Sequence, residues 1–184
     1  DVDADSTVTS LSVANITPIA IADGSSLSGA ITLTAGSIKF AETGTLASSI
    51  SMSGGTTLDA DNSLTVSGAL TQSGDTTIDV LASKTLTYSG ATLSLGPNTL
   101  IARGGGTLSN TNALELNHAD SLLTLDGTVT IEKASVNESS NIGKGLAINI
   151  SSTISSLTVE ADTELNVVNG ETFSGSTEIA ADKT

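Results

Sequence analysis

The chain has 184 residues and no cysteine, and its 20 acidic and 6 basic residues give a formal net charge of −14. This charge argues against nucleic acid as a partner, because no basic stripe is present to neutralise phosphates, and the absence of cysteine excludes disulfides and thiolate metal sites. With 28 Ser and 28 Thr but one Tyr, two Phe and no Trp, the chain must build its core from Leu, Ile, Val and Ala. The longest apolar stretches, such as "ITPIAIA" at residues 16–22, are too short to span a bilayer, so no membrane insertion is expected.

A short turn motif recurs from one end of the chain to the other. It places Ala and an acidic or polar residue ahead of an apolar residue that starts an alternating run. Its copies are Ala4-Asp5, Ala22-Asp23, Ala41-Glu42, Ala60-Asp61, Ala82-Ser83, Ala119-Asp120, Ala161-Asp162 and Ala181-Asp182, with degenerate copies near Asn98 and Asn141. Nine steps from Asp5 to Asp182 give a mean period of about 20 residues, which is typical of solenoid repeats.

Short alternating runs between these turns predict β-strands. Leu, Thr and an apolar residue alternate at residues 64–66 and 86–88, and similar alternation appears at 128–131 and 146–150. A period of two is the signature of a strand with one buried face. The least regular stretch, residues 135–150, is expected to hold a loop.

A repeat of this length with two or three short strands fits one coil of a parallel β-helix. The sequence therefore predicts an all-β parallel β-helix (β-solenoid) of about 9 coils of roughly 20 residues, forming a single domain over residues 1–184. Leu, Ile and Val point inward and Ser and Thr outward, and stacking buries what one coil alone leaves exposed. A β-sandwich is the alternative, since it also uses short alternating strands with regular turns.

The acidic turns suggest two kinds of chemistry. If the coils are in register, Asp5, Asp23, Glu42, Asp61, Asp120 and Asp162 are expected to lie along one edge. Their carboxylates then either cap the turns or bridge a divalent cation. The candidate metal ligands are Asp1, Asp3 and Asp5, in a "DVDADS" opening that resembles an EF-hand loop, and Asp59 and Asp61. Ser6 and Ser12 stand where that loop requires Gly and Glu, so no cofactor is predicted and calcium is the alternative.

Catalytic residues are scarce. The single His, His118, is interpreted as a surface turn residue, and the single Arg is Arg103. Hydrolases and lyases of polysaccharides need convergent carboxylates or a basic residue beside a cation, and no such set is recognisable. We therefore predict that the chain has no catalytic residue and is not an enzyme.

Outward hydroxyl pairs suggest a further alternative, an ice-binding or carbohydrate-binding β-solenoid. Examples are Thr32 with Thr34, Thr85 with Thr87, and Thr128 with Thr130. A flat array of such pairs resembles the ice-binding surface of some β-solenoid antifreeze proteins. The pairs are not expected to recur at one position in every coil, however, and solubilising a strand surface is the preferred interpretation.

The repeats "ADNSLTVSGALTQSG", "ASKTLTYSGATLSLG" and "ETFSGSTEIAADKT" resemble the β-helical stalks of bacterial surface proteins, namely autotransporter passengers and filamentous-haemagglutinin-like adhesins. The resemblance implies a right-handed parallel β-helix that is exported to the cell surface for display, adhesion or assembly, and it transfers no functional residue. Both termini fall in the turn motif. The chain is therefore expected to be either a segment of a longer stalk or a filament subunit, with copies of itself end to end or other cell-surface components as partners.

Overall fold

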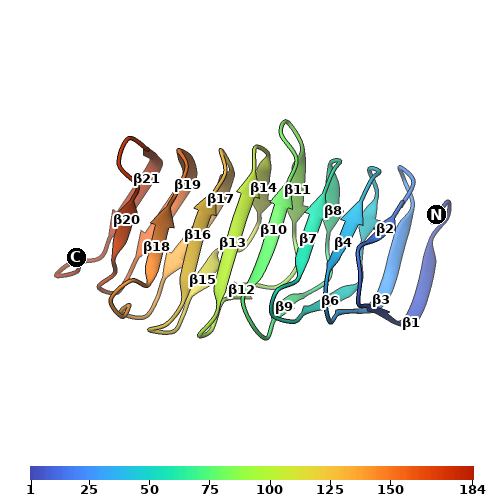
Figure 1. Ribbon diagram of the computed structural model, residues 1–184, viewed down its shortest axis with the longest axis horizontal. Helices are drawn as coiled ribbons and strands as arrows, with labels where there is room; N and C mark the ends of the chain where they lie inside the picture. Colours follow the sequence, from blue (N-terminus) through green and yellow to red (C-terminus); the bar gives the residue numbers. More distant parts are fainter.

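The computed structural model describes residues 1–184, with the side chain of Pro18 excepted, and it is a β-solenoid. Coils stack along one axis, and the two termini lie at opposite ends of the resulting rod (Figure 1). Every strand pairing in the described chain is parallel, which rules out the β-sandwich alternative. No helix of the described residues is long and apolar enough to cross a membrane.

One side of the rod, which we call face 1, is an eight-stranded sheet to which each coil contributes one strand. Its strands are β2 (Thr17–Ile19), β4 (Ser37–Phe40), β7 (Thr57–Ala60), β10 (Thr76–Val80), β13 (Thr99–Gly104), β16 (Leu122–Asp126), β18 (Gly145–Ile148) and β20 (Leu165–Val167).

A thirteen-stranded sheet covers the other two sides, faces 2 and 3. Face 2 holds β5 (Thr45–Leu46), β8 (Leu64–Val66), β11 (Thr85–Tyr88) and β14 (Thr107–Asn110), and face 3 holds β6 (Ser49–Met52), β9 (Leu70–Gln72), β12 (Leu93–Ser94) and β15 (Leu114–Leu116). Five longer strands bend from face 2 into face 3: β1 (Ser6–Val13), β3 (Ser26–Leu33), β17 (Thr130–Val136), β19 (Ser152–Val159) and β21 (Phe173–Ile179). The middle coils are therefore divided at this corner, whereas the coils near both ends cross it in one strand.

The register gives the true period. One face 1 ladder runs from Thr17 to Val167 in seven steps, through Ile38, Leu58, Ile78, Ala102, Leu125 and Ile148. The mean step is therefore about 21 residues. The predicted β-solenoid is confirmed: face 1 contains eight strands and face 2 contains nine, so the chain forms about eight complete coils.

A single aliphatic core runs inside the coils. Inward positions such as Ile38, Leu58 and Ile78 are buried, while the residues between them are partly exposed. Stacked coils thus bury what a lone coil cannot, as solenoids require. The predicted loop is confirmed for residues 137–144, but residues 145–148 form strand β18.

Tyr88 occupies a break in face 3. Strands β9 and β12 belong to successive coils but form no ladder with each other in the described chain. The phenol of Tyr88, which is 2% exposed, lies at this break. Its hydroxyl accepts the N–H of Leu70 at 3.1 Å and donates to the carbonyl of Ala91, so one side chain replaces the missing strand pairing.

Asn110 plays a comparable part at the corner between faces 2 and 3. Its side chain is fully buried, and its amide nitrogen donates to the carbonyls of Asn112 at 2.8 Å and Lys133 at 2.7 Å. Its amide oxygen accepts the N–H of Lys133 at 3.2 Å. The amide thereby pairs with the backbone of the next coil as another peptide group would.

Replacing Tyr88 with Phe is expected to lower the free energy of unfolding by about 1–3 kcal/mol, because the buried Leu70 N–H and the Ala91 carbonyl lose their partner while the ring is kept. Urea denaturation measures the change. Tyr88→Leu, which also removes the ring, is expected to be less stable still. A Tyr88→Phe variant as stable as the wild type would show that the hydroxyl does not hold this break together.

Candidate functional site

The acidic turns lie on two corners of the rod, not on one edge. Asp23, Glu42 and Asp61 each follow a face 1 strand and precede a face 2 strand. Asp120 and Asp162 instead follow face 3 strands and precede β16 and β20 of face 1. The expectation of a single acidic row is therefore wrong, because both corners lead into a strand with an inward apolar residue and so carry the same sequence pattern.

Turn carboxylates bind the backbone of the neighbouring coil. Asp5 accepts the N–H of Ser26 at 2.9 Å and its hydroxyl at 2.8 Å. Asp162 similarly accepts the N–H of Thr184 at 3.1 Å. The predicted cap of each residue's own turn is therefore wrong for these two residues: the amide that each carboxylate binds belongs to the adjacent coil, so the side chain joins two coils.

Two glutamates in the last coil also bind backbone N–H groups of an adjacent coil, but here it is the preceding coil. Glu171 accepts the N–H and hydroxyl of Ser151 at 2.6 and 2.7 Å, and these hydrogen bonds hold its pKa below the usual value of 4.5. Glu164 accepts the N–H of Gly143 at 2.6 Å and an amide hydrogen of Asn166, which lower its pKa in the same way. The hydrogen bonds to the preceding coil thus favour the charged form of both side chains.

A charged row crosses face 1. Lys39, Asp59, Asp79 and Arg103 occupy one outward ladder, and Lys39 also lies 2.6 Å from Asp61. Arg103 pairs with Asp79 at 2.6 Å. Burial raises the pKa of Asp59, as do the nearby Asp61 and Asp79, and Lys39 only partly offsets this. The adjacent carboxylates are therefore flanked by the chain's own cations.

The predicted metal ligands do not form one cluster. Val2 bridges Ile21 in an extended segment, so Asp1, Asp3 and Asp5 do not wrap into a loop, and Asp5 is engaged by Ser26. Asp59 and Asp61 share the ammonium of Lys39. Among the described residues, no group of three or more His, Cys, Asp or Glu side chains is arranged to hold a metal ion. The calcium alternative stays a prediction without a geometric site.

His118 lies at the corner between β15 and β16, as its interpretation as a surface turn residue expects. Its side chain is about half exposed, and its Nδ1 accepts the N–H of Asp120 at 3.0 Å. This hydrogen bond fixes a turn and leaves the imidazole on the outside of the rod.

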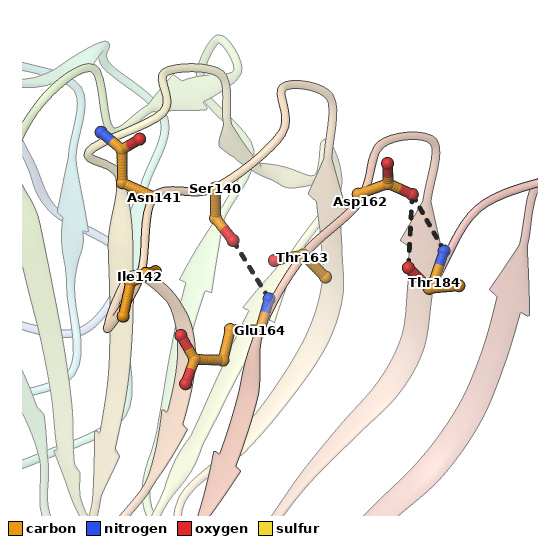
Figure 2. A pocket seen from close by; sticks show the side chains of 7 residues that line it. All are labelled: Ser140, Asn141, Ile142, Asp162, Thr163, Glu164 and Thr184. Carbon is orange, nitrogen blue, oxygen red and sulfur yellow. Dashed lines mark hydrogen bonds between the residues drawn. The ribbon is translucent and has the colours of Figure 1, made fainter.

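Two shallow hollows mark the surface. The first lies at the corner between faces 3 and 1 near the C-terminus, where the Ser140 hydroxyl accepts the N–H of Glu164 and Asp162 holds Thr184 (Figure 2). Thr163 contributes a buried hydroxyl oxygen that has no hydrogen-bond partner in the described chain. The second hollow lies on face 1 beside the charged row, between Gly36, Gly55, Asp59 and Arg103. Both are open depressions whose polar groups are largely used between coils.

The last coil presents apolar side chains to solvent. Leu165, Val167 and Ile179 continue inward ladders of the core but are 45%, 40% and 54% exposed. The residues that precede Val167 and Ile179 in these ladders, Ile148 and Val159, are buried. This coil therefore carries an unpaired strand edge and an uncovered end of the core, the most distinct surface outside the regular faces.

Sequence reasoning missed the side chains that replace backbone pairing. Tyr88 and Asn110 interrupt inward positions that otherwise carry aliphatic residues, and a polar group at such a position is the signal that could have identified them. The Arg103–Asp79 pair depends on a step between coils that is longer than the assumed period. A uniform repeat could not have placed these two residues side by side.

No family model matches the chain, and no curated protein or solved structure matches it either.

Glu171→Gln is expected to destabilise the protein at pH 7 and to have a vanishing effect in acid. Because the folded pKa of Glu171 is lowered, its stabilisation is present above the usual pKa of 4.5 and is lost as the pH falls through the folded value. Urea denaturation at pH 7 and at about pH 3 compares the effect of the substitution in the two conditions. Glu138→Gln, in the exposed loop after β17, is the matched control and should change little at either pH. An equal loss at both pH values would contradict the charge-assisted contact.

Proposed function

We propose that the chain is a structural, extracellular β-solenoid that serves as a rigid segment of a cell-surface stalk or adhesin. The observation that carries this proposal is the unbroken stack of parallel coils around one aliphatic core, with only shallow hollows on its surface. Such a stack resists bending because each coil is hydrogen-bonded to its neighbours on three faces, with Tyr88 bridging the gap between β9 and β12. Its eight coil-to-coil steps from β1 to β21 give an axial length of about 38 Å.

The single His and the single Arg of the chain both serve structure, which supports a role as a spacer and not as a catalyst. His118 fixes a corner, and Arg103 is tied to Asp79. The surface is acidic and rich in small hydroxyls, which keeps a rod soluble and apart from other rods. The resemblance of the repeats to bacterial surface stalks supports the same assignment, and the proposal includes no enzymatic activity.

Antibody labelling of the source cells tests the location. An antibody raised against the folded chain is expected to label intact cells, and brief protease treatment of those cells should remove the signal. A cytoplasmic protein detected with its own antibody controls for lysis. Labelling that appears only after permeabilisation would contradict the proposed stalk.

End-to-end assembly is a second candidate function, favoured by the exposed ladder positions of the last coil. One further coil, paired in register with the last one, would cover the side chains of Leu165, Val167 and Ile179. We propose that β1 of a second copy supplies it, because β1 and β21 both cross the corner between faces 2 and 3 as single bent strands. Exposed strand edges of this kind template further pairing.

Assembly is measured by analytical ultracentrifugation and electron microscopy over a range of protein and salt concentrations. Six acidic residues between Glu160 and Asp182 and four between Asp1 and Asp23 would repel across the junction, so added salt should promote association. Val167→Glu and Ile179→Glu are expected to abolish it, whereas Leu81→Glu, at an exposed apolar residue in the middle of the rod, should not. Monomers under all conditions would contradict this second function.

A further inference from the structure

Residues 168–171 form an exposed turn between β20 and β21, at the corner that leads from face 1 to face 2. The N–H of Glu171 donates to the carbonyl of Val168 at 2.9 Å, and Gly170 has a φ of 90°. A type II turn requires a positive φ at its third residue, which favours Gly there. Asn169 and Gly170 thus occupy the two central positions of this turn, and both are exposed to solvent.

Most asparagine side chains of this protein are held by hydrogen bonds, and Asn169 is an exception. Eight of the eleven asparagines use the side-chain amide in a hydrogen bond, in most cases to a neighbouring coil: Asn62, Asn98, Asn110, Asn112, Asn117, Asn141, Asn149 and Asn166. Within the described chain, the side-chain amides of Asn15, Asn137 and Asn169 make no such bond, and all three residues are exposed.

Asn169 differs from the other two free asparagines in the residue that follows it. Bulky residues follow Asn15 and Asn137, whereas Gly170 follows Asn169. The N–H of Gly170 takes part in no hydrogen bond within the described chain, and a Cβ placed on Gly170 would meet no atom within 4 Å. Glycine also allows the backbone to rotate with little steric cost. The nitrogen of Gly170 is therefore free to approach the side chain of Asn169.

A free asparagine amide next to a free glycine nitrogen is what spontaneous deamidation needs. In this reaction, the backbone nitrogen loses its proton to solvent base and attacks the side-chain carbon Cγ of Asn. The Cγ–N bond of the side chain breaks, ammonia leaves, and a cyclic succinimide forms. Water then opens the ring at one of its two carbonyls, which gives Asp or isoaspartate. Ammonia is thus exchanged for water, and no reactant besides solvent is consumed.

The same turn positions a contact between the last coil and the coil before it. Glu171 accepts the N–H and the hydroxyl of Ser151 at 2.6 and 2.7 Å, and the Ser151 N–H has no other partner in the described chain. Isoaspartate at position 169 would lengthen the main chain by one carbon two residues before Glu171. Either product would also add a negative charge to the turn. Both changes disfavour the present position of the Glu171 carboxylate.

We propose that Asn169 is a site of spontaneous deamidation, and that its product loosens the contact between Glu171 and Ser151. The modification needs only residues of this chain and water, so it does not depend on the stalk function. Its effect is local, because the other coils are joined through their own ladders and turns. The last coil therefore becomes less firmly attached as the protein ages.

Mass spectrometry of the protein after incubation in neutral buffer at physiological temperature tests the first part of the proposal. The wild type is expected to lose the side-chain amide of Asn169 before that of any other asparagine, and tandem spectra of the tryptic fragment 145–183 locate the change. Isoaspartyl methyltransferase should label the same position. The loss should be faster in mildly alkaline buffer, because the attacking nitrogen must first give up its proton.

Two single substitutions control this experiment. Asn169→Gln should remain unmodified at this position, because a glutamine side chain closes its ring much more slowly. Asn137→Gln, which changes the free asparagine in the loop after β17, is the matched control and should leave the loss at Asn169 unchanged. An Asn169 that stays intact in the wild type, or a loss that begins at another asparagine, would overturn the proposal.

Hydrogen exchange of the Ser151 amide, followed by NMR, tests the second part. Local opening exposes an amide to exchange without global unfolding. Aged wild-type protein is expected to exchange the Ser151 amide faster than fresh protein, while the amide of Ile78, in the middle of the rod, keeps its rate. Asn169→Gln aged in the same way should retain the rate of fresh protein. A deamidated protein whose Ser151 amide exchanges no faster would overturn the proposal.

Discussion

The parallel hydrogen-bond ladder between successive coils is the interaction on which the rest of the structure depends. Strands of successive coils pair on every face except between β9 and β12, so the coils must place equivalent residues at equivalent points. Because side chains alternate with a period of two, a slip of one residue would turn the core side chains outward. The steps between coils nevertheless differ in length, and the step from Ile78 to Ala102 is longer than the step from Ile148 to Val167. The turns absorb this variation, and the core positions therefore remain aligned.

Side chains complete the ladder where the backbone leaves gaps. Tyr88 connects two coils whose face 3 strands do not pair, and Asn110 pairs with the next coil at a corner. Asp5 and Glu171 hold backbone amides of adjacent coils from outside. A buried polar group without such a partner lowers the stability of the folded state. These residues therefore lie where stacked coils need a side chain to complete their hydrogen bonds. This explains why so many of the acidic side chains serve structure and do not converge on a common site.

The fold could be predicted from sequence because it depends on a simple repeat, in which aliphatic and hydroxyl residues alternate and a turn motif recurs at a nearly constant interval. The predicted acidic row was wrong, because the motif of Asp61 and that of Asp162 mark different corners with the same pattern. The pairing of Arg103 with Asp79 and the bridging role of Tyr88 depend on exact step lengths. The alignment of Thr65, Thr87 and Ser109 does so as well, and a mean period does not supply such lengths. The register between successive coils therefore determines which side chains lie next to one another on the surface.

Disulfide trapping tests this register most directly, and the chain has no cysteine of its own to complicate the result. Thr124 and Ala147 are outward partners on adjacent coils, and Asn166 is the next residue of the same ladder. A Thr124→Cys/Ala147→Cys variant is expected to oxidise readily, because partners on neighbouring strands have the Cα separation that a disulfide needs. A Thr124→Cys/Asn166→Cys variant, with its cysteines two coils apart at about 9.6 Å, should remain reduced. Equal oxidation of both pairs, or oxidation of only the second, would contradict the stacked parallel coils.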